Sequence, residues 1–199
     1  MLTLDHLAVA ATDLATGKDW VEAALGVPMQ AGGQHQRYGT HNVLLGLGDD
    51  LYLEVIAKDP AAAPYDGPTW FGLDHFTGPP RLANWICQTD DLPNAPDVAG
   101  PAQSLSRGDL AWQITVPPDG GLPYDGGHPT LIVWDPGTLH PARRLKDVGC
   151  RLIRLTITHP QADHLRAITS LDDARVVFQT GPLGFAAIID TPDGHRTLA

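Results

Sequence analysis

The sequence predicts an α+β protein built from a repeated module in which one strand, one helix and three further strands follow one another. Residues 1–57 show this order of patterns in full, and looser versions of it return in residues 82–135 and 150–199. Recurrence at a spacing of roughly 70 residues indicates duplication of a module, because solenoid repeats are usually shorter. We therefore expect one compact unit of module-like segments.

The first module begins with a strand and a helix. Residues 4–10 alternate as a half-buried strand does. Thr12 and Asp13 then offer side-chain oxygens to the free N–H groups of a helix start, and Gly26 stands where that helix should end.

The rest of this module is read from two apolar runs. Residues 42–47 and 51–56 are separated by Gly-Asp-Asp, which is typical of a hairpin turn. A polar segment before them completes β-α-β-β-β over residues 1–57. Residues 58–81 are rich in proline and glycine but carry large aromatic side chains, so we expect a connecting loop packed over the core.

The second segment, residues 82–135, is degenerate. Its first strand, 82–87, leads into Thr89–Leu92, which resembles residues 11–14 at the start of the first helix. Prolines interrupt the helix that should follow. Two later strands are expected at 110–116 and 130–134.

The third segment, residues 150–199, starts with a strand at 152–158. Pro160 occupies a favourable first-turn position for a helix that continues to about residue 168. Further strands are expected at 176–179, 185–190 and 196–198.

Charge and composition argue against some classes of binding partner. The net charge of −10 argues against nucleic acid and against an anionic membrane, because both repel an acidic surface. No secretory signal and no apolar run of membrane-spanning length is seen, so a cytoplasmic location is expected. Cys87 and Cys150 lie in apolar runs and are expected to be buried thiols.

Three runs carry a family resemblance: Asp5–Val9, Gly39–Asn42 and Leu51–Ala57. Together they resemble the glyoxalase-like domain of the vicinal oxygen chelate superfamily, which includes glyoxalase, bleomycin resistance proteins and extradiol dioxygenases. The resemblance implies paired modules whose curved, mixed and antiparallel sheets surround a cup-shaped cavity. It also implies a divalent metal held by the first and fourth strands of each module.

His6 and Glu54 match the metal ligands of the first and fourth strands, and we expect them to be the catalytic pair as well. Imidazole and carboxylate suit Zn²⁺, Mn²⁺, Fe²⁺ or Ni²⁺. Because alternate residues of a strand point to the same face, the His6 and Glu54 side chains can both lie on one side of the sheet if their strands are neighbours. The alternative is structural: a strand histidine and a strand-edge glutamate that pair with each other or with an arginine. A carboxylate at Glu54 would be costly to bury without a partner, so a positive or protic group must meet it.

The later segments depart from the family pattern. Asn84 stands at the ligand position of the second segment, Arg154 falls near that position in the third, and residues 130–134 contain no carboxylate. The metal site is therefore half-present, to be completed by water, substrate or a nearby histidine, or it is metal-free. His41 is the best additional candidate, as a ligand, as a substrate-binding group or as a structural histidine.

Polar and aromatic residues on the predicted strands are candidates for binding a small molecule. They are His41, Asn42, Tyr52, Asn84, Trp85 and Trp112. Because Asn84 and Trp85 are adjacent, one of them must face away from the cavity. His128 and His140 lie in glycine- and proline-rich loops and are expected at the surface or rim, whereas His35 shows no usable pattern.

Two functions follow from these expectations. The first is a metal-assisted lyase, isomerase or dioxygenase acting on a small oxygenated substrate. The alternative is non-catalytic binding or sequestration of a small molecule by the same fold. Neither uses a nucleotide cofactor, since no phosphate-binding glycine motif is present. Exposed edge strands make a homodimer a reasonable expectation.

Overall fold

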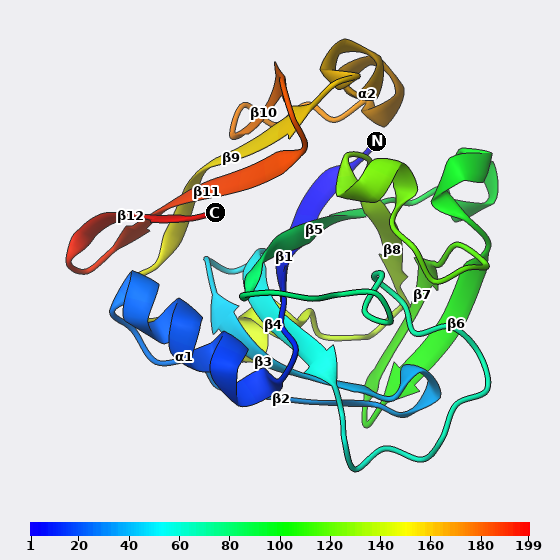
Figure 1. Ribbon diagram of the computed structural model, residues 1–199, viewed down its shortest axis with the longest axis horizontal. Helices are drawn as coiled ribbons and strands as arrows, with labels where there is room; N and C mark the ends of the chain where they lie inside the picture. The colour runs from blue at the N-terminus through cyan, green and yellow to red at the C-terminus, as the bar shows by residue number, and fades with distance from the viewer.

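The computed structural model describes all 199 residues, and Figure 1 shows their arrangement. The first module consists of β1 (Thr3–Ala10), α1 (Leu14–Leu25), β2 (Gln30–His35), β3 (Thr40–Gly46) and β4 (Tyr52–Lys58). The second consists of β5 (Arg81–Gln88), β6 (Ala102–Arg107), β7 (Leu110–Thr115) and β8 (Thr130–Trp134). The remaining elements are β9 (Arg151–His159), α2 (Ala162–Thr169), β10 (Val176–Thr180), β11 (Gly184–Thr191) and β12 (Gly194–Leu198).

Helix α1 has the ends that the sequence predicts. Asp13 caps its start by accepting a hydrogen bond from the backbone N–H of Thr16 at 2.8 Å. Gly26 ends it in the left-handed conformation, with φ of 73°. Gly17 allows the helix to approach the sheet closely, because a Cβ there would lie 2.5 Å from Val55 Cγ1.

The two modules share one eight-stranded sheet with the order β2-β3-β4-β1-β5-β8-β7-β6. In each half the first strand runs parallel to the last strand, β1 beside β4 and β5 beside β8. The antiparallel pair β1 and β5 joins the halves. The sheet curls strongly, so that its two edge strands, β2 and β6, come into contact (Figure 1). The predicted α+β fold with a curved sheet around a cup is confirmed.

Prolines replace the helix of the second module with short turns. Between β5 and β6 the chain forms two 3₁₀ turns, η2 (Leu92–Asn94) and η3 (Asp97–Ala99). Proline lacks a backbone N–H and blocks a regular helix, so this interruption follows from the sequence. The sequence did not predict β6, whose residues alternate between exposed and half-buried positions.

The C-terminal segment forms a separate four-stranded sheet with the order β10-β9-β11-β12. Its first strand, β9, runs parallel to β10, the strand that directly follows the helix. In the first module the parallel neighbour of β1 is instead the last strand, β4. The two segments therefore share an order of elements but connect them differently.

The large sheet separates two apolar layers. On its outer face Leu7 and Leu53 pack with α1 and the C-terminal sheet. On its inner face Ala8, Ile56 and Ile86 pack with the loop between β4 and β5. That loop is packed as predicted, because Trp70 and Phe71 are buried on the inner face. Alternation of side chains along the strands thus assigns each residue to one layer.

Cys87 and Cys150 are free and buried, as predicted. No helix has the length and apolar character required to cross a membrane.

Candidate active site

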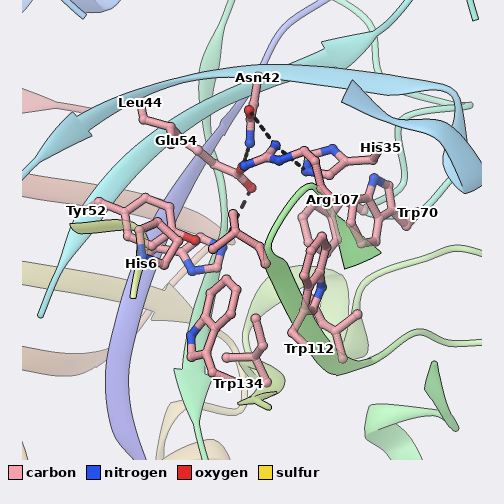
Figure 2. Close-up of a pocket in the computed structure, with 15 residues that line it drawn as sticks. His6, His35, Asn42, Leu44, Tyr52, Glu54, Trp70, Arg107, Trp112 and Trp134 are labelled. Carbon is pink, nitrogen blue, oxygen red and sulfur yellow. Dashed lines mark hydrogen bonds and ion pairs between the residues drawn. The ribbon is translucent and has the colours of Figure 1, made fainter. Parts of the chain in front are cut away.

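The inner face of the curved sheet is hollowed into a pocket with polar groups on one side and aromatic walls on the other (Figure 2). Its lining comes from both modules, from the β4–β5 loop and from the segment between β8 and β9. The lining residues are His6, His35, Asn42, Leu44, Tyr52, Glu54, Trp70, Phe71, Arg107, Leu110, Trp112, Ile114, Ile132, Trp134 and Pro141. The space enclosed at the centre is about 30 Å³, enough for about two water molecules.

A bulge in β1 creates the first part of the site. Leu4 pairs with Cys87 and His6 with Ile86, which leaves Asp5 as the extra, unpaired residue. The Asp5 carboxylate is fully buried and lies 2.6 Å from His6 Nδ1. Its other oxygen contacts Trp134 Nε1 at 2.9 Å and His140 Nε2 at 3.1 Å.

Asp5 fixes the orientation of these rings. Burial alone would raise the pKa of Asp5, but the hydrogen bonds from His140 and His6 outweigh it and hold the pKa well below its usual range. An ionised carboxylate only accepts hydrogen bonds, so His6 donates from Nδ1. The Nε2 of a neutral His6 therefore carries a lone pair toward the cavity.

Glu54 completes the central pair. Since β1 and β4 are parallel neighbours, His6 and Glu54 share one face of the sheet, and His6 Nε2 lies 3.7 Å from Glu54 Oε1. This separation is too long for a hydrogen bond. Glu54 Oε2 accepts a hydrogen bond from Asn42 Nδ2 at 2.8 Å, which leaves Oε1 facing His6 and the pocket.

Asn42 connects the carboxylate side of the pocket to its cationic side. Its Oδ1 accepts hydrogen bonds from the backbone N–H of Gly33 at 2.9 Å and from Arg107 Nη1 at 3.3 Å. A Cβ at Gly32 would lie only 2.0 Å from this oxygen. The Gly32–Gly33 pair in β2 thus makes room for the Asn42 amide.

A chain of neutral groups holds Arg107. Its Nη1 lies 3.3 Å from His35 Nε2, and His35 Nδ1 lies 3.0 Å from Thr40 Oγ1, which also accepts from Trp70 Nε1 at 3.1 Å. Burial, reinforced by the positive charge of Arg107, lowers the pKa of His35 to about 3. His35 is therefore neutral near pH 7 and accepts from Arg107.

Tyr52 and the tryptophans form the walls. The Tyr52 ring stacks on His6, with ring centroids 4.4 Å apart. Burial, with the charges of Asp5 and Glu54, raises the pKa of Tyr52 far above its usual range, so its hydroxyl remains protonated. Trp112 and Trp134 are neighbours, with ring centroids 5.7 Å apart and ring planes tilted by 49° to each other. The pocket thus offers hydrogen-bonding groups beside an apolar wall of aromatic rings.

Not every predicted site residue reaches the pocket. His41 alternates with Asn42 and Leu44 along β3 and points away; its Nδ1 lies 3.9 Å from Asp59 Oδ1. The Asn84 side chain lies on the inner side of the sheet, but its Nδ2 donates a hydrogen bond to Thr130 Oγ1 at 2.9 Å. Trp85 faces the outer layer, where its Nε1 donates to the Gly126 carbonyl at 3.0 Å. The expectations that these three residues bind metal or substrate in this pocket do not agree with its lining.

Several residues that shape the site were not predicted from the sequence. Asp5, His35 and Arg107 were given no role, and His140 was expected at the surface or rim but contacts the buried Asp5. His128, expected in the same place, is buried with Nδ1 2.8 Å from the Pro129 carbonyl. Only the Gly32–Gly33 pair was a usable signal, because adjacent glycines in a strand often mark a close approach of other groups.

The donor set does not fit the divalent metal that the superfamily implies. His6 and Glu54 could supply two ligands, but no group of three or more histidine, cysteine or acidic side chains is arranged to hold a metal ion. Asn42 uses both ends of its amide within the protein, and the Arg107 guanidinium adds a positive charge to the same pocket. Metal sites need more donors and no such cation.

The paired modules, the curled sheet and the pocket inside it define a protein of the vicinal oxygen chelate superfamily. The chain belongs to the glyoxalase-like domain family, whose sequence profile matches residues 4–171. The match covers both modules of the large sheet and ends just after α2.

The chain is also similar to proteins of known structure. A hypothetical protein from Staphylococcus aureus is similar over 92% of this chain and 87% of its own, with a TM-score of 0.59 and 12% identity. A Streptomyces coelicolor methylmalonyl-CoA epimerase variant in complex with 2-nitronate-propionyl-CoA is similar over 70% of this chain and 99% of its own, with a TM-score of 0.47 and 14% identity. Methylmalonyl-CoA epimerase from Mycobacterium tuberculosis is similar over 66% of this chain and 85% of its own, with a TM-score of 0.42 and 16% identity. Among curated proteins, no relative matches the sequence.

Proposed function

We propose that this glyoxalase-like protein binds a small oxygenated organic molecule in the pocket and transfers a proton on it, as an isomerase or lyase does. The observation that carries the proposal is the His6–Glu54 pair. Two proton-accepting atoms, His6 Nε2 and Glu54 Oε1, lie 3.7 Å apart on the lining of one cavity. A general base must reach its proton within hydrogen-bond distance, and both residues line the cavity in which a substrate would bind.

The surrounding groups assign a role to each member of the pair. Asn42 holds one oxygen of Glu54, so Oε1 is the oxygen that takes a proton from a carbon next to a carbonyl group. His6, fixed by Asp5, accepts the hydrogen bond of a substrate hydroxyl and positions that carbon. The protonated Tyr52 hydroxyl donates to the oxygen on which negative charge develops.

The metal-assisted alternatives receive less support from these residues. A metal-assisted lyase and a dioxygenase both need more protein ligands than His6 and Glu54 supply. The proposed proton transfer uses only side chains of this chain.

Hydrogen–deuterium exchange provides the test. In D₂O, ¹H NMR should show enzyme-dependent loss of C–H signals next to the carbonyl in a panel of small α-hydroxy ketones and α-keto acids. Glu54→Gln should lose this exchange, because the amide is not a base. Glu22→Gln is the matched control, since Glu22 lies on α1 and is the only other glutamate. Equal exchange by wild type and Glu54→Gln would refute the proposal.

Non-catalytic binding is the second candidate, and the aromatic walls favour it. If the protein only binds its ligand, compounds of the panel should bind to the wild-type protein without any exchange of their C–H hydrogens. Calorimetry on the same samples separates the two functions, because it reports binding whether or not a proton moves.

A further inference from the structure

Arg107 differs from the charged arginines on the surface. Five arginines pair with aspartates: Arg143, Arg144, Arg151, Arg166 and Arg175. Arg107 instead lies in the pocket, where both of its hydrogen bonds leave from Nη1 and end on neutral acceptors, Asn42 and His35. A protein with a net charge of −10 thus keeps a cation without a carboxylate partner inside its pocket.

Strand β2 leaves room for the Arg107 side chain at Gly33. Arg107 ends β6, at one edge of the sheet, and reaches across to β2 and β3 at the other edge (Figure 2). A Cβ at Gly33 would lie 2.9 Å from Arg107 Cδ and 3.1 Å from Nε and Nη1. Only glycine allows the side chain to lie this close to the β2 backbone.

The surroundings leave Arg107 without a direct ion pair. His35 resists protonation, because its burial lowers its pKa to about 3, so it accepts a hydrogen bond but carries no charge. Glu54 is separated from Arg107 by the Asn42 amide, which bonds to both. The donors on Nε and Nη2 make no hydrogen bond within the protein, and a guanidinium presents such donors as a planar fork.

We propose that Arg107 is the anion-binding residue of the pocket and that the ligand is a small carboxylate with a flat apolar body. A carboxylate can take two parallel hydrogen bonds from the free side of the guanidinium. The apolar body would then lie along Trp112 and the neighbouring wall. This inference rests on the proposed function only in placing the ligand in this pocket.

The charges also orient the ligand. Glu54 repels a carboxylate and Arg107 attracts it, so the anionic end lies at Arg107 and the reacting carbon lies toward Glu54 and His6. The pocket is partly open to solvent, so the body of the ligand can extend along the wall beyond the central space of about 30 Å³.

Isothermal titration calorimetry with isosteric probes tests the proposal. Benzoate and benzamide have the same shape but differ in charge. Wild-type protein should bind benzoate at least about tenfold more tightly than benzamide, as expected for charge-assisted hydrogen bonds. Inorganic phosphate is the third probe, since guanidinium also binds phosphate; it should bind more weakly than benzoate, because it has no apolar body.

Variants separate charge from geometry. Arg107→Met should abolish the preference for benzoate, and Arg107→Lys should retain part of it, because an ammonium keeps the charge without the fork. Gly33→Ala should weaken benzoate severalfold with the charge intact. Arg37→Met is the matched control, because Arg37 joins β6 at Gln103 outside the pocket. Circular dichroism verifies folding; if Arg107→Met is unfolded, Arg107→Lys and Gly33→Ala decide.

The possible failures are distinguishable. Equal binding of benzoate and benzamide, no binding of either, tighter binding of phosphate, or an unchanged preference in the Arg107 variants overturns the carboxylate proposal. Glu54→Gln should still prefer benzoate, because it keeps Arg107 and removes a repelling charge. Benzoate preference without proton exchange in the wild type would overturn the proton-transfer function and leave the anion site standing.

Discussion

Asp5 and His6 are neighbours in the sequence, and their side chains meet inside the protein with 2.6 Å between Oδ1 and Nδ1. Regular alternation along a strand would place them on opposite faces. The bulge at Asp5 removes that alternation locally and lets one carboxylate hold His6, His140 and Trp134 together.

The first prediction concerns this carboxylate. Asp5→Asn should lower the free energy of unfolding by about 3 kcal/mol, because three donors lose a charged acceptor in a buried site. Urea denaturation followed by circular dichroism measures the change. Asp90→Asn is the control, since the exposed Asp90 contacts only the N-terminal amine and its loss should leave the free energy of unfolding nearly unchanged. Equal losses in both variants would contradict the role of Asp5.

The second prediction is a pH dependence caused by His35. Its pKa falls from 6.5 to about 3 on folding, so between these values the unfolded state binds more protons than the folded state. The free energy of unfolding should therefore decrease as the pH falls from 6.5, by at most about 1.4 kcal/mol per pH unit from this group.

His35→Gln tests this prediction, because glutamine can replace both hydrogen bonds but does not titrate. Urea denaturation at pH 6.5, 5.8 and 5.0 should give a shallower slope for this variant than for the wild type. A residual slope is expected, because burial also lowers the pKa of His128. His195→Gln, at an exposed position, should keep the wild-type slope. An unchanged slope in His35→Gln would show that the group does not resist protonation.

A third prediction concerns the space beside Asn42. Gly32→Ala would place a Cβ 2.0 Å from Asn42 Oδ1 and 2.6 Å from the Asn42 carbonyl oxygen, so the β2 backbone or the amide must move. We expect a loss of about 1–3 kcal/mol in the free energy of unfolding, as for other overpacked sites. Gly46→Ala is the control on β3, where the new Cβ would lie 3.6 Å from Leu145 Cβ, an ordinary contact. Similar stability of the two variants would argue against a built space at Gly32.

Most of the fold could be predicted because its signals are local. The cap at Asp13, the glycine at the end of α1 and the prolines after β5 each act through their own backbone. Strand β6 was missed because it is an edge strand with half-exposed residues and therefore lacks a strong apolar pattern. The order of the strands in the C-terminal sheet depends on long-range pairing, which local patterns do not encode.

The site was predicted only where strand parity was regular. His6 and Glu54 could be placed on one face from their parity and the parallel pairing of their strands. Asp5 could not, because its orientation depends on a bulge. Arg107 could not either, because it reaches His35 and Asn42 only after the sheet has curled and brought its two edges together.

The fourth prediction concerns divalent metals. Because the pocket combines two donors with a guanidinium, adding Mn²⁺, Zn²⁺ or Ni²⁺ should not raise the melting temperature. An ion that filled a site at about 100 times its Kd would add about 2.7 kcal/mol to the free energy of unfolding, which is easily detected. His6→Ala provides the comparison. Stabilisation of the wild type that disappears in His6→Ala would demonstrate a metal site that these residues do not predict.

The last prediction separates the two tryptophans that the sequence treated alike. Trp85 is almost fully buried in the outer layer, where it contacts Phe178 of the C-terminal sheet, whereas Trp112 lines the pocket. Trp85→Ala should lower the free energy of unfolding by about 3–5 kcal/mol, the usual cost of removing a buried aromatic side chain, and leave the benzoate Kd of the folded fraction nearly unchanged. Trp112→Phe, which keeps an apolar ring but reduces the wall, should weaken benzoate severalfold with a smaller loss of stability. Urea denaturation and calorimetry on both variants measure the two effects independently. If Trp85→Ala weakened benzoate more than Trp112→Phe did, the ligand would have to bind outside the pocket on the inner face of the sheet.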